Sequence, residues 1–212
     1  MSLPLPRTGA CNLDKFGVEL SGSRGPLLQP RVQYRFRVLF FGFGSPEGTA
    51  EALTFNTNTV TIPNLSFETQ EVNSYNSRAY FAGKHTWGTA SLQVRDTYDD
   101  SVSRAVGAQL QRQLDHYNQT GFQSAADYKF KMVIQQLSGG TSADDVNQNI
   151  HLCGCFLEDV TYDGFDYASS AMRNIEMTIR PDNVIIENGG RGEEFTVFAN
   201  PGVDPQADTI NL

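Results

Sequence analysis

The 212-residue sequence predicts a mainly β protein, an antiparallel β-sandwich or barrel with one flanking α-helix. Several segments alternate apolar and polar residues with a period of two, which is typical of half-buried strands. Only one segment carries an apolar stripe at helical spacing. The connections between these segments are too short for the crossovers that parallel strands need, so we expect the strands to pair antiparallel.

Glycine and proline divide the sequence into three regions. Residues 1–30 are rich in both and lack periodicity, which predicts an extended N-terminal arm. Residues 31–187 hold the periodic segments and form the predicted β domain. Residues 188–212 predict a C-terminal tail with one short strand-like patch at residues 195–198.

The segments before the helix predict a series of strands. The first places aromatic and β-branched side chains on one face and arginines on the other. Pro63 separates two further strand candidates, because proline has no N–H to donate to a sheet. A polar stretch with irregularly placed aromatic residues then predicts a long hairpin or a protruding loop. In order, these segments are residues 31–44, 53–62, 65–75, 74–88 and, alternating again, 89–96.

One segment predicts a helix over about residues 100–118, with Asp99 or Asp100 as its N-cap. Its apolar residues recur about every fourth position and should face a sheet: Val102, Val106, Leu110, Leu114 and Tyr117. Alternation returns after the helix, at residues 128–137, and two long strands follow at 149–162 and 171–186.

The formal charge of −8 comes from 16 basic and 24 acidic residues, and its distribution is uneven. Residues 157–212 hold 3 basic and 11 acidic residues, whereas residues 1–44 hold 6 basic and 2 acidic ones. Oppositely charged ends favour head-to-tail contact between copies or contact within one copy, although a solvated acidic tail explains the same pattern. The acidic balance disfavours binding of nucleic acid by charge attraction.

His151, Cys153 and Cys155 form the most enzyme-like pattern. On a regular strand they share one face but stand about 6.6–6.8 Å apart at each step, too far for one zinc ion to bind all three. Motifs for a serine nucleophile or a phosphate loop are missing. We therefore expect no catalytic site, metal or cofactor.

Three cysteines cannot pair completely within one chain, so we expect reduced thiols. The alternative is a disulfide between copies, because Cys11 lies in the predicted arm and could reach a neighbour. The longest apolar run is far shorter than a membrane span, and prolines interrupt the N-terminus where a secretion signal needs an apolar segment. We expect no membrane anchor.

The order and spacing of several short stretches resemble the tail tube proteins of contractile-tailed bacteriophages. That family shares its fold with the haemolysin-coregulated protein of type VI secretion. The matching stretches span about three quarters of the chain: residues 29–36, 61–63, 82–87, 90–96, 152–156 and 174–179. Leu157 stands where many relatives have proline, and the tail after Glu187 has no counterpart in short members.

The resemblance implies a structural subunit whose sheets join into a continuous ring barrel in a hexamer. Rings would stack into the inner tube of a contractile tail in the virion, after assembly in the host cytoplasm. The implied partners are further copies, the tail sheath protein, and baseplate and tail terminator proteins. Tape measure protein and DNA would pass through the lumen without specific binding, along a wall with more Asp, Glu, Asn and Thr than Lys or Arg.

We expect contacts between subunits at residues of the long loop and at the thiols: Cys11, Arg78, Tyr80, Lys84, Trp87, Cys153 and Cys155. A secretion-type or headless injection tube is the alternative within the same architecture. A ligand-binding β-sandwich is a third possibility, with an aromatic pocket built from Tyr75, Tyr80, Phe81 and Trp87.

Overall fold

The computed structural model describes residues 31–45, 50–121, 124–139, 146–188 and 196–197. The chain divides into two units, Met1–Tyr34 and Arg35–Leu212. Of the first unit only residues 31–34 are described, and they contain a turn and no strand. The predicted arm and most of the predicted tail, together with Cys11, lie outside the described residues, so the region boundaries stay predictions.

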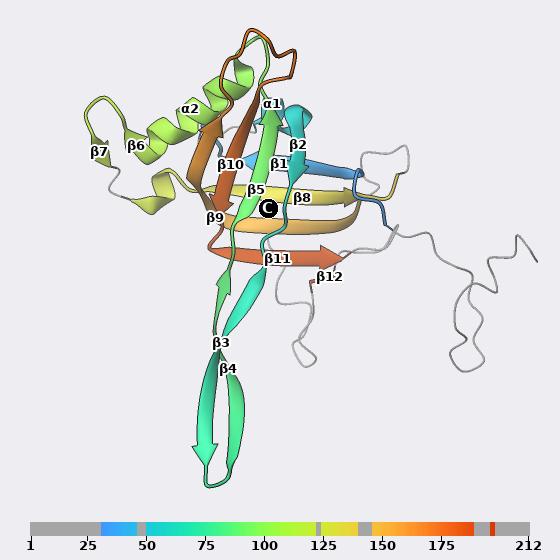
Figure 1. The fold of residues 1–212 in the computed structure, drawn as a ribbon, viewed down its shortest axis with the longest axis vertical. Coiled ribbons are helices and arrows are strands. Elements are labelled where there is room, and N and C mark those ends of the chain that lie inside the picture. The colour runs from blue at the N-terminus through green and yellow to red at the C-terminus, as the bar shows by residue number, and fades with distance from the viewer. Residues whose placement is uncertain (1–30, 46–49, 122–123, 140–145, 189–195, 198–212) are drawn as a thin grey trace, which may run out of the picture. The chain divides into compact units, whose positions relative to one another are not determined.

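The second unit is built from two groups of antiparallel strands that share the long strand β9 (Figure 1). Sheet A contains the first part of β9, and sheet B contains its last part, from Phe156 onward. In Figure 1 the strands of sheet A run across those of sheet B. The members of sheet A are β1 (Phe36–Phe41), β8 (Phe130–Leu137), β9 (Val146–Tyr162), β11 (Asn183–Asn188) and β12 (Thr196–Val197). Sheet B joins β9 to β10 (Asn174–Arg180), β5 (Ala90–Arg95) and β2 (Thr57–Val60).

The core lies between the two sheets and follows the predicted alternation. Side chains at alternate positions of each central strand are buried and form one cluster. The cluster includes Val38, Phe40, Ala90, Leu92, Val94, Phe130, Met132, Ile134, Ile175, Met177 and Ile179. The mainly β, antiparallel fold class is therefore confirmed.

β9 passes from sheet A to sheet B at Gly154, which has a φ of +66°. The backbone N–H of Asp182 donates to the carbonyl of Cys153 across this corner, at 3.0 Å. The strand expected over residues 171–186 is accordingly two strands, β10 and β11, and the single long strand was wrong. The neighbour of a bent strand must turn with it, and Pro181 lies at that turn.

The predicted helix is α2 (Ser101–Gln113), and it begins where the sequence indicates. Asp100 occupies the N-cap position without a side-chain hydrogen bond, while Asp99 Oδ1 accepts from Ser101 Oγ at 2.9 Å. Side-chain hydrogen bonds, first from Thr97 and then from Ser101, lower the pKa of Asp99.

α2 ends at Gln113, so the expected end near residue 118 was wrong. Leu114 already belongs to β6 (Leu114–Asp115), which pairs with β7 (Thr120–Gly121). Asp115 Oδ1 accepts from the backbone N–H of Tyr117 at 3.0 Å, which stabilises a turn in place of further helix. Tyr117 is therefore fully exposed rather than on the helix stripe.

A short helix, α1 (Glu51–Asn56), occupies the start of the segment that was expected to be a strand from residue 53. Its residue Leu53 is completely buried in the core cluster. Thr57 Oγ1 and Asn56 Nδ2 donate to carbonyls four residues earlier, at 2.7 and 2.8 Å, and so satisfy the end of the helix. Only the second part of that segment, β2, is a strand. A 3₁₀ turn, η3 (Ala125–Asp127), precedes β8.

Polar side chains help to fix α2 on the sheets. Gln109 is completely buried, although it is polar. Its Oε1 accepts from the N–H of Gly44 at 2.9 Å, and its Nε2 donates to the carbonyl of Tyr128 at 2.6 Å. Arg112 also donates to the carbonyl of Gly42, at 2.6 Å. The helix is thus tied to the chain after β1 and to the turn before β8.

Among the described residues, every helix is too short or too polar to pass through a lipid bilayer.

Candidate assembly surfaces

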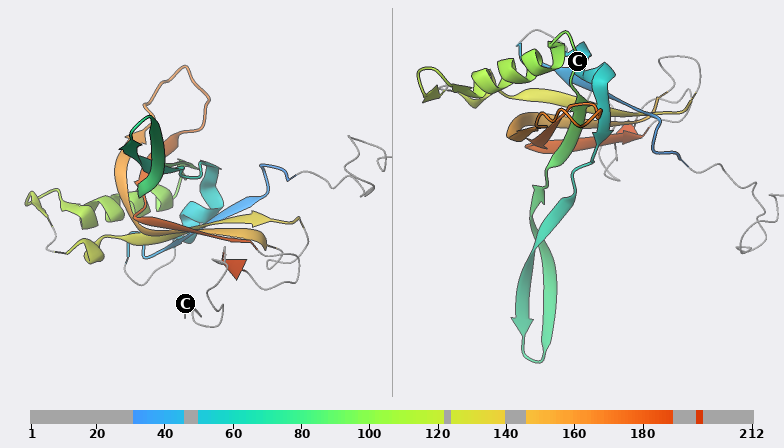
Figure 2. Two further views of the ribbon diagram at one scale, coloured as in Figure 1. Left: turned by 90° about the horizontal axis from the view of Figure 1, so that it is seen from below. Right: turned by 45° about the horizontal axis from the view of Figure 1, so that its top comes forward.

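The hairpin formed by β3 (Leu65–Ser74) and β4 (Ser77–Trp87) extends beyond the sheets (Figures 1 and 2). All ten residues of β3 are exposed. Residues 74–88 were expected to form a hairpin or a loop by themselves, but they supply only the turn and the second strand, β4, of a hairpin whose first strand is the separately predicted β3. A lone two-stranded hairpin is only marginally stable in water, so an exposed hairpin of this length favours contact with a partner.

The outer part of the hairpin has two chemically different faces. Glu71 lies opposite Tyr80, and Asn73 opposite Arg78, on the charged face. Arg78 Nε lies 3.5 Å from Glu71 Oε1 there, in an exposed ion pair. The neutral face has no charged residue and carries Gln70, Val72, Ala79 and Phe81. Its apolar side chains are exposed, which is typical of a surface that is covered in an assembly.

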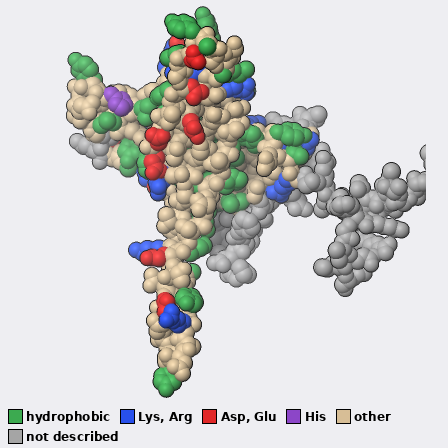
Figure 3. Space-filling view, viewed as in Figure 1, with side chains coloured by type: hydrophobic (Ala, Val, Ile, Leu, Met, Phe, Trp, Pro, Cys, Tyr) green, Lys and Arg blue, Asp and Glu red, His purple; other side chains and the backbone are tan. Residues whose placement is uncertain are grey.

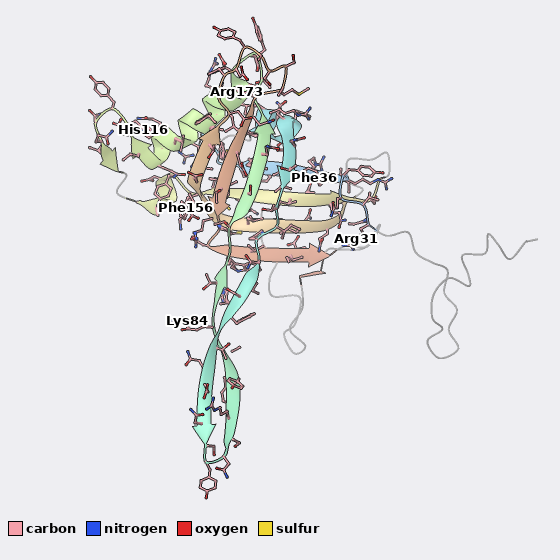
Figure 4. All side chains as sticks on the ribbon, viewed as in Figure 1. Arg31, Phe36, Lys84, His116, Phe156 and Arg173 are labelled. Atoms are coloured by element: carbon pink, nitrogen blue, oxygen red, sulfur yellow. The ribbon has the colours of Figure 1, made fainter. Side chains whose placement is uncertain are left out.

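The predicted contact residues of this segment differ in exposure and in their position along the hairpin. Arg78, Tyr80 and Lys84 are exposed on the hairpin, and Figure 4 shows Lys84 well away from the sheets. Trp87 lies at the base of the hairpin, packs against the core and donates from Nε1 to Asn183 Oδ1 at 3.2 Å.

The four aromatic residues considered for a ligand pocket are not brought together. Tyr75 lies at the turn and is fully exposed, and Tyr80 and Phe81 are neighbours in sequence that point to opposite faces. Trp87 belongs to the base of the hairpin. These positions do not form a shared concave site.

Sheet B ends in an unpaired strand on each side. Within the described residues, β2 pairs with β5 alone, and the Leu157–Tyr162 part of β9 pairs with β10 alone. Such edges present free N–H and C=O groups and can accept another strand. They are the second candidate surface for contact between copies.

The outer face of sheet B is polar from one edge to the other. Thr59, Gln93, Glu176 and Thr161 form one row across the four strands. The next row contains Ser91, Thr178 and Asp159. Figure 3 shows acidic side chains over this region, while the hairpin carries charges of both signs. The opposite side of the same strands is the apolar core.

The corner at Gly154 separates the two cysteines of β9. Cys153 and His151 are partly exposed, whereas Cys155 has no exposed surface, and its Sγ donates to the carbonyl of Leu152. The expectation that His151, Cys153 and Cys155 share one face was therefore wrong for Cys155. His151 Nε2 lies 2.9 Å from Glu187 Oε2 instead, across the β9–β11 pair. Within the described part of the chain, no group of three potential ligands could hold a metal ion.

The two thiols are expected to differ in reactivity. Burial raises the pKa of Cys155 to about 12, so its thiol stays protonated and shielded at pH 8. Iodoacetamide at that pH should add one label to the peptide that contains Cys153 and Cys155 in the native protein. It should add two labels in urea. Two labels under native conditions, measured by mass spectrometry, would contradict the buried position of Cys155.

The connection between β10 and β9 carries exposed apolar residues that the sequence analysis did not single out. Phe165, Tyr167 and Met172 are all more than two-thirds exposed. Arg173 lies at the base of this loop (Figure 4). Its guanidinium lies over the Phe165 ring, 4.7 Å from the ring centroid, and forms an ion pair with Asp96 at 2.9 Å. Alternation cannot reveal such residues, because they lie outside the strands.

No family model matches the sequence, and no curated protein matches it. Solved structures do match the fold. A chain of the PVC extracellular contractile injection system, in its sheath–tube complex in the extended state, has a TM-score of 0.55 and 17% identity. The match covers 75% of this chain and 92% of that chain.

Two chains of the anti-feeding prophage are also similar. The match in its tube terminating cap has a TM-score of 0.58 and 15% identity, and covers 81% of this chain and 100% of that chain. The match in its baseplate has a TM-score of 0.57 and 13% identity, and covers 76% of this chain and 97% of that chain.

The chain has the tail-tube fold. The predicted resemblance is thus confirmed at the level of the fold.

Proposed function

We propose that this protein is a structural subunit of a tail tube. Copies form hexameric rings through their sheets, and the rings stack into the inner tube of a contractile tail. The observation that carries this proposal is that sheet B is unpaired at both β2 and β9 within the described residues. A ring of copies removes such edges by pairing each with its neighbour.

The strand directions support closure of the ring. Every pair in sheet B is antiparallel, so β9 and β2 run in opposite directions at its two edges. A second copy placed beside the first therefore brings β2 antiparallel to β9, and the alternation continues around the ring. With an odd number of strands, both edges of the sheet would run in the same direction, and neighbouring copies would have to pair in parallel.

The polar face of sheet B is suited to line the bore. Glu176 and Asp159 are the acidic residues of the two rows described above, and Arg180 on β10 donates from Nε to Glu158 Oε2 at 2.8 Å. The neighbouring Glu158 carboxylate raises the pKa of Arg180. A wall of hydroxyl, amide and carboxylate groups offers few cations to phosphate, so DNA passes without being held.

The remaining parts of the proposal concern partners and location. The tube contacts a tail sheath, a baseplate, and a tail terminator, and tape measure protein and DNA pass through it. It belongs to the virion and acts in genome ejection without catalysis. The likeness to chains from a sheath–tube complex and a baseplate supports the sheath and the baseplate as partners.

A secretion-type or headless injection tube is the second candidate. The similar structures come from an extracellular contractile injection system and from the anti-feeding prophage. This origin supports an injection tube as the second candidate function. The two functions differ in the contents of the bore. Nuclease-protected DNA in purified particles supports the phage tail, and protein cargo without DNA supports the alternative.

Electron microscopy tests the proposal directly. Purified full-length protein at increasing concentration should form rings with sixfold symmetry or stacked tubes in negative stain. The backbone N–H of Thr61 donates to Ser91 on β5, so the N–H of the adjacent Val60 faces the open edge of β2. Val60→Pro removes that donor and should reduce ring formation, while Gln111→Ala on the exposed face of α2 should have no effect. A protein that stays monomeric at all concentrations contradicts the proposal.

A further inference from the structure

The side chain of Gln113 pairs with β9 as a neighbouring strand would. Its Oε1 accepts from the backbone N–H of Leu157 at 2.8 Å, and its Nε2 donates to the carbonyl of the same residue at 2.9 Å. A residue in an antiparallel sheet exchanges this same pair of hydrogen bonds with its partner. One amide side chain at the end of α2 thus satisfies both backbone groups of Leu157.

This pairing closes one position of an edge that is otherwise free. β8 ends its pairing with β9 at Cys155, and β10 occupies the other side of Leu157. Beyond Leu157, the edge from Asp159 to Tyr162 has no strand beside it within the described residues. A strand added from outside meets the Gln113 amide when it reaches Leu157.

Matching of faces limits how β2 of a second copy can pair with this edge. Thr59 lies on the polar face and Val60 on the apolar side, and Thr161 and Val160 of β9 have the same two orientations. Pairing Thr59 with Thr161 places Val60 against Val160, so both layers continue between copies. A shift of two residues places Thr59 opposite Asp159 and keeps the faces matched, but it brings the added chain to Leu157.

We propose that Gln113 fixes the register between copies by blocking strand addition at Leu157. The β2 strand of a second copy then pairs with the Asp159–Tyr162 edge, with Thr59 opposite Thr161. This inference rests on the proposed function, because it concerns the contact that closes the ring. It assigns Gln113 as a positioning residue and not as a contact residue.

Disulfide trapping in assembled protein tests the register. In a background with Cys11→Ser and Cys153→Ser, two variants combine Thr59→Cys with either Thr161→Cys or Asp159→Cys. Within one chain, Thr59 and Thr161 lie in the same row and are separated by β5 and β10, which is roughly 14 Å at the usual strand spacing. That distance prevents a disulfide within one chain, so any disulfide joins two copies.

We expect the Thr59–Thr161 pair to give a ladder of linked subunits on non-reducing gels, and the Thr59–Asp159 pair to give at least about tenfold less. Adding Gln113→Met keeps the length of the side chain but removes both hydrogen bonds, and should raise the Thr59–Asp159 product to a comparable yield. Gln113→Ala provides a second variant if the methionine packs poorly. Gln111→Ala is the matched control, because Gln111 lies on the same helix and its hydrogen bonds go to Asp115 and His116 in the turn after the helix, not to β9.

Each outcome decides a different claim. An unchanged preference for Thr59–Thr161 in both Gln113 variants overturns the role of Gln113. Tubes that form without either disulfide overturn the β2–β9 pairing but leave the proposed function standing. Absence of rings and tubes in the unmodified protein overturns the proposed function, and with it this inference.

Discussion

Replacing residues 70–81 with Asn-Gly is expected to abolish tube formation and leave the subunit folded. The change removes the outer hairpin, joins Thr69 to Ala82, which already face each other, and supplies a turn that suits a two-residue hairpin loop. Every deleted residue is exposed, so the free energy of unfolding should change by less than about 1 kcal/mol. Tube formation should fall below detection in negative stain, because rings lose the surface that reaches beyond the sheets.

A point variant locates the effect on one face. Phe81→Asp adds a charge to the neutral face of the hairpin and should prevent stacking almost as completely as the deletion. Gln70→Ala lies opposite Phe81 on the same face, keeps the face uncharged and serves as the control. Normal tubes from the Phe81→Asp protein would show that this face stays in water. Urea unfolding of each variant, measured by circular dichroism, separates loss of assembly from loss of the fold.

Gly154→Ala is expected to destabilise the subunit by about 2–3 kcal/mol, from the strain of a left-handed non-glycine residue and the loss of local contacts. Gly154 has a φ of +66°, and a Cβ there would lie 2.3 Å from Asp182 Oδ2 and 2.9 Å from Asp182 Cγ. Asp182 would have to turn away, which breaks its ion pair with Lys129. Equilibrium unfolding in urea, below the concentration for assembly, measures the change.

Two further variants check the cause. Gly164→Ala is the matched control, because no atom lies within 4 Å of the Cβ it would add, and it should leave the stability unchanged. An Asp182→Ala background removes Oδ2 and Cγ, the two atoms closest to the added Cβ, and so most of the steric part of the Gly154→Ala cost. The two changes should therefore be less than additive. If the losses of stability from Gly154→Ala and Asp182→Ala add fully, the cost of Gly154→Ala comes from backbone strain alone.

The strands could be predicted from the sequence because the residue pattern of each strand reflects which of its two faces is buried. Alternation identifies one buried and one exposed face without knowledge of the neighbours, and Ala90, Leu92 and Val94 fill the core as expected. The resemblance added the tail-tube fold. A hairpin was among the structures expected for the segment that contains Arg78, Tyr80 and Lys84, although its two faces depend on the pairing of β3 with β4.

The helix shows where a sequence pattern misleads. Leu110 packs against the core as predicted, but the stripe does not continue to Leu114 and Tyr117, which are exposed. The polar Gln109 and Gln113 instead follow Val102 and Val106 on the side that meets the sheets. Their spacing is helical, but hydrophobicity alone does not select a glutamine for burial. Only the nearby unpaired groups of Gly44, Tyr128 and Leu157 make these amides favourable there.

The sequence by itself therefore determined the strand content, the antiparallel class and the resemblance, since these depend on local periodicity and the order of segments. The tertiary structure decided where β9 bends, which edges of sheet B remain open, and which helix side chains pair with backbone. Those features depend on hydrogen bonds between residues far apart in the chain, such as Gln113 and Leu157, and no local pattern encodes their partners.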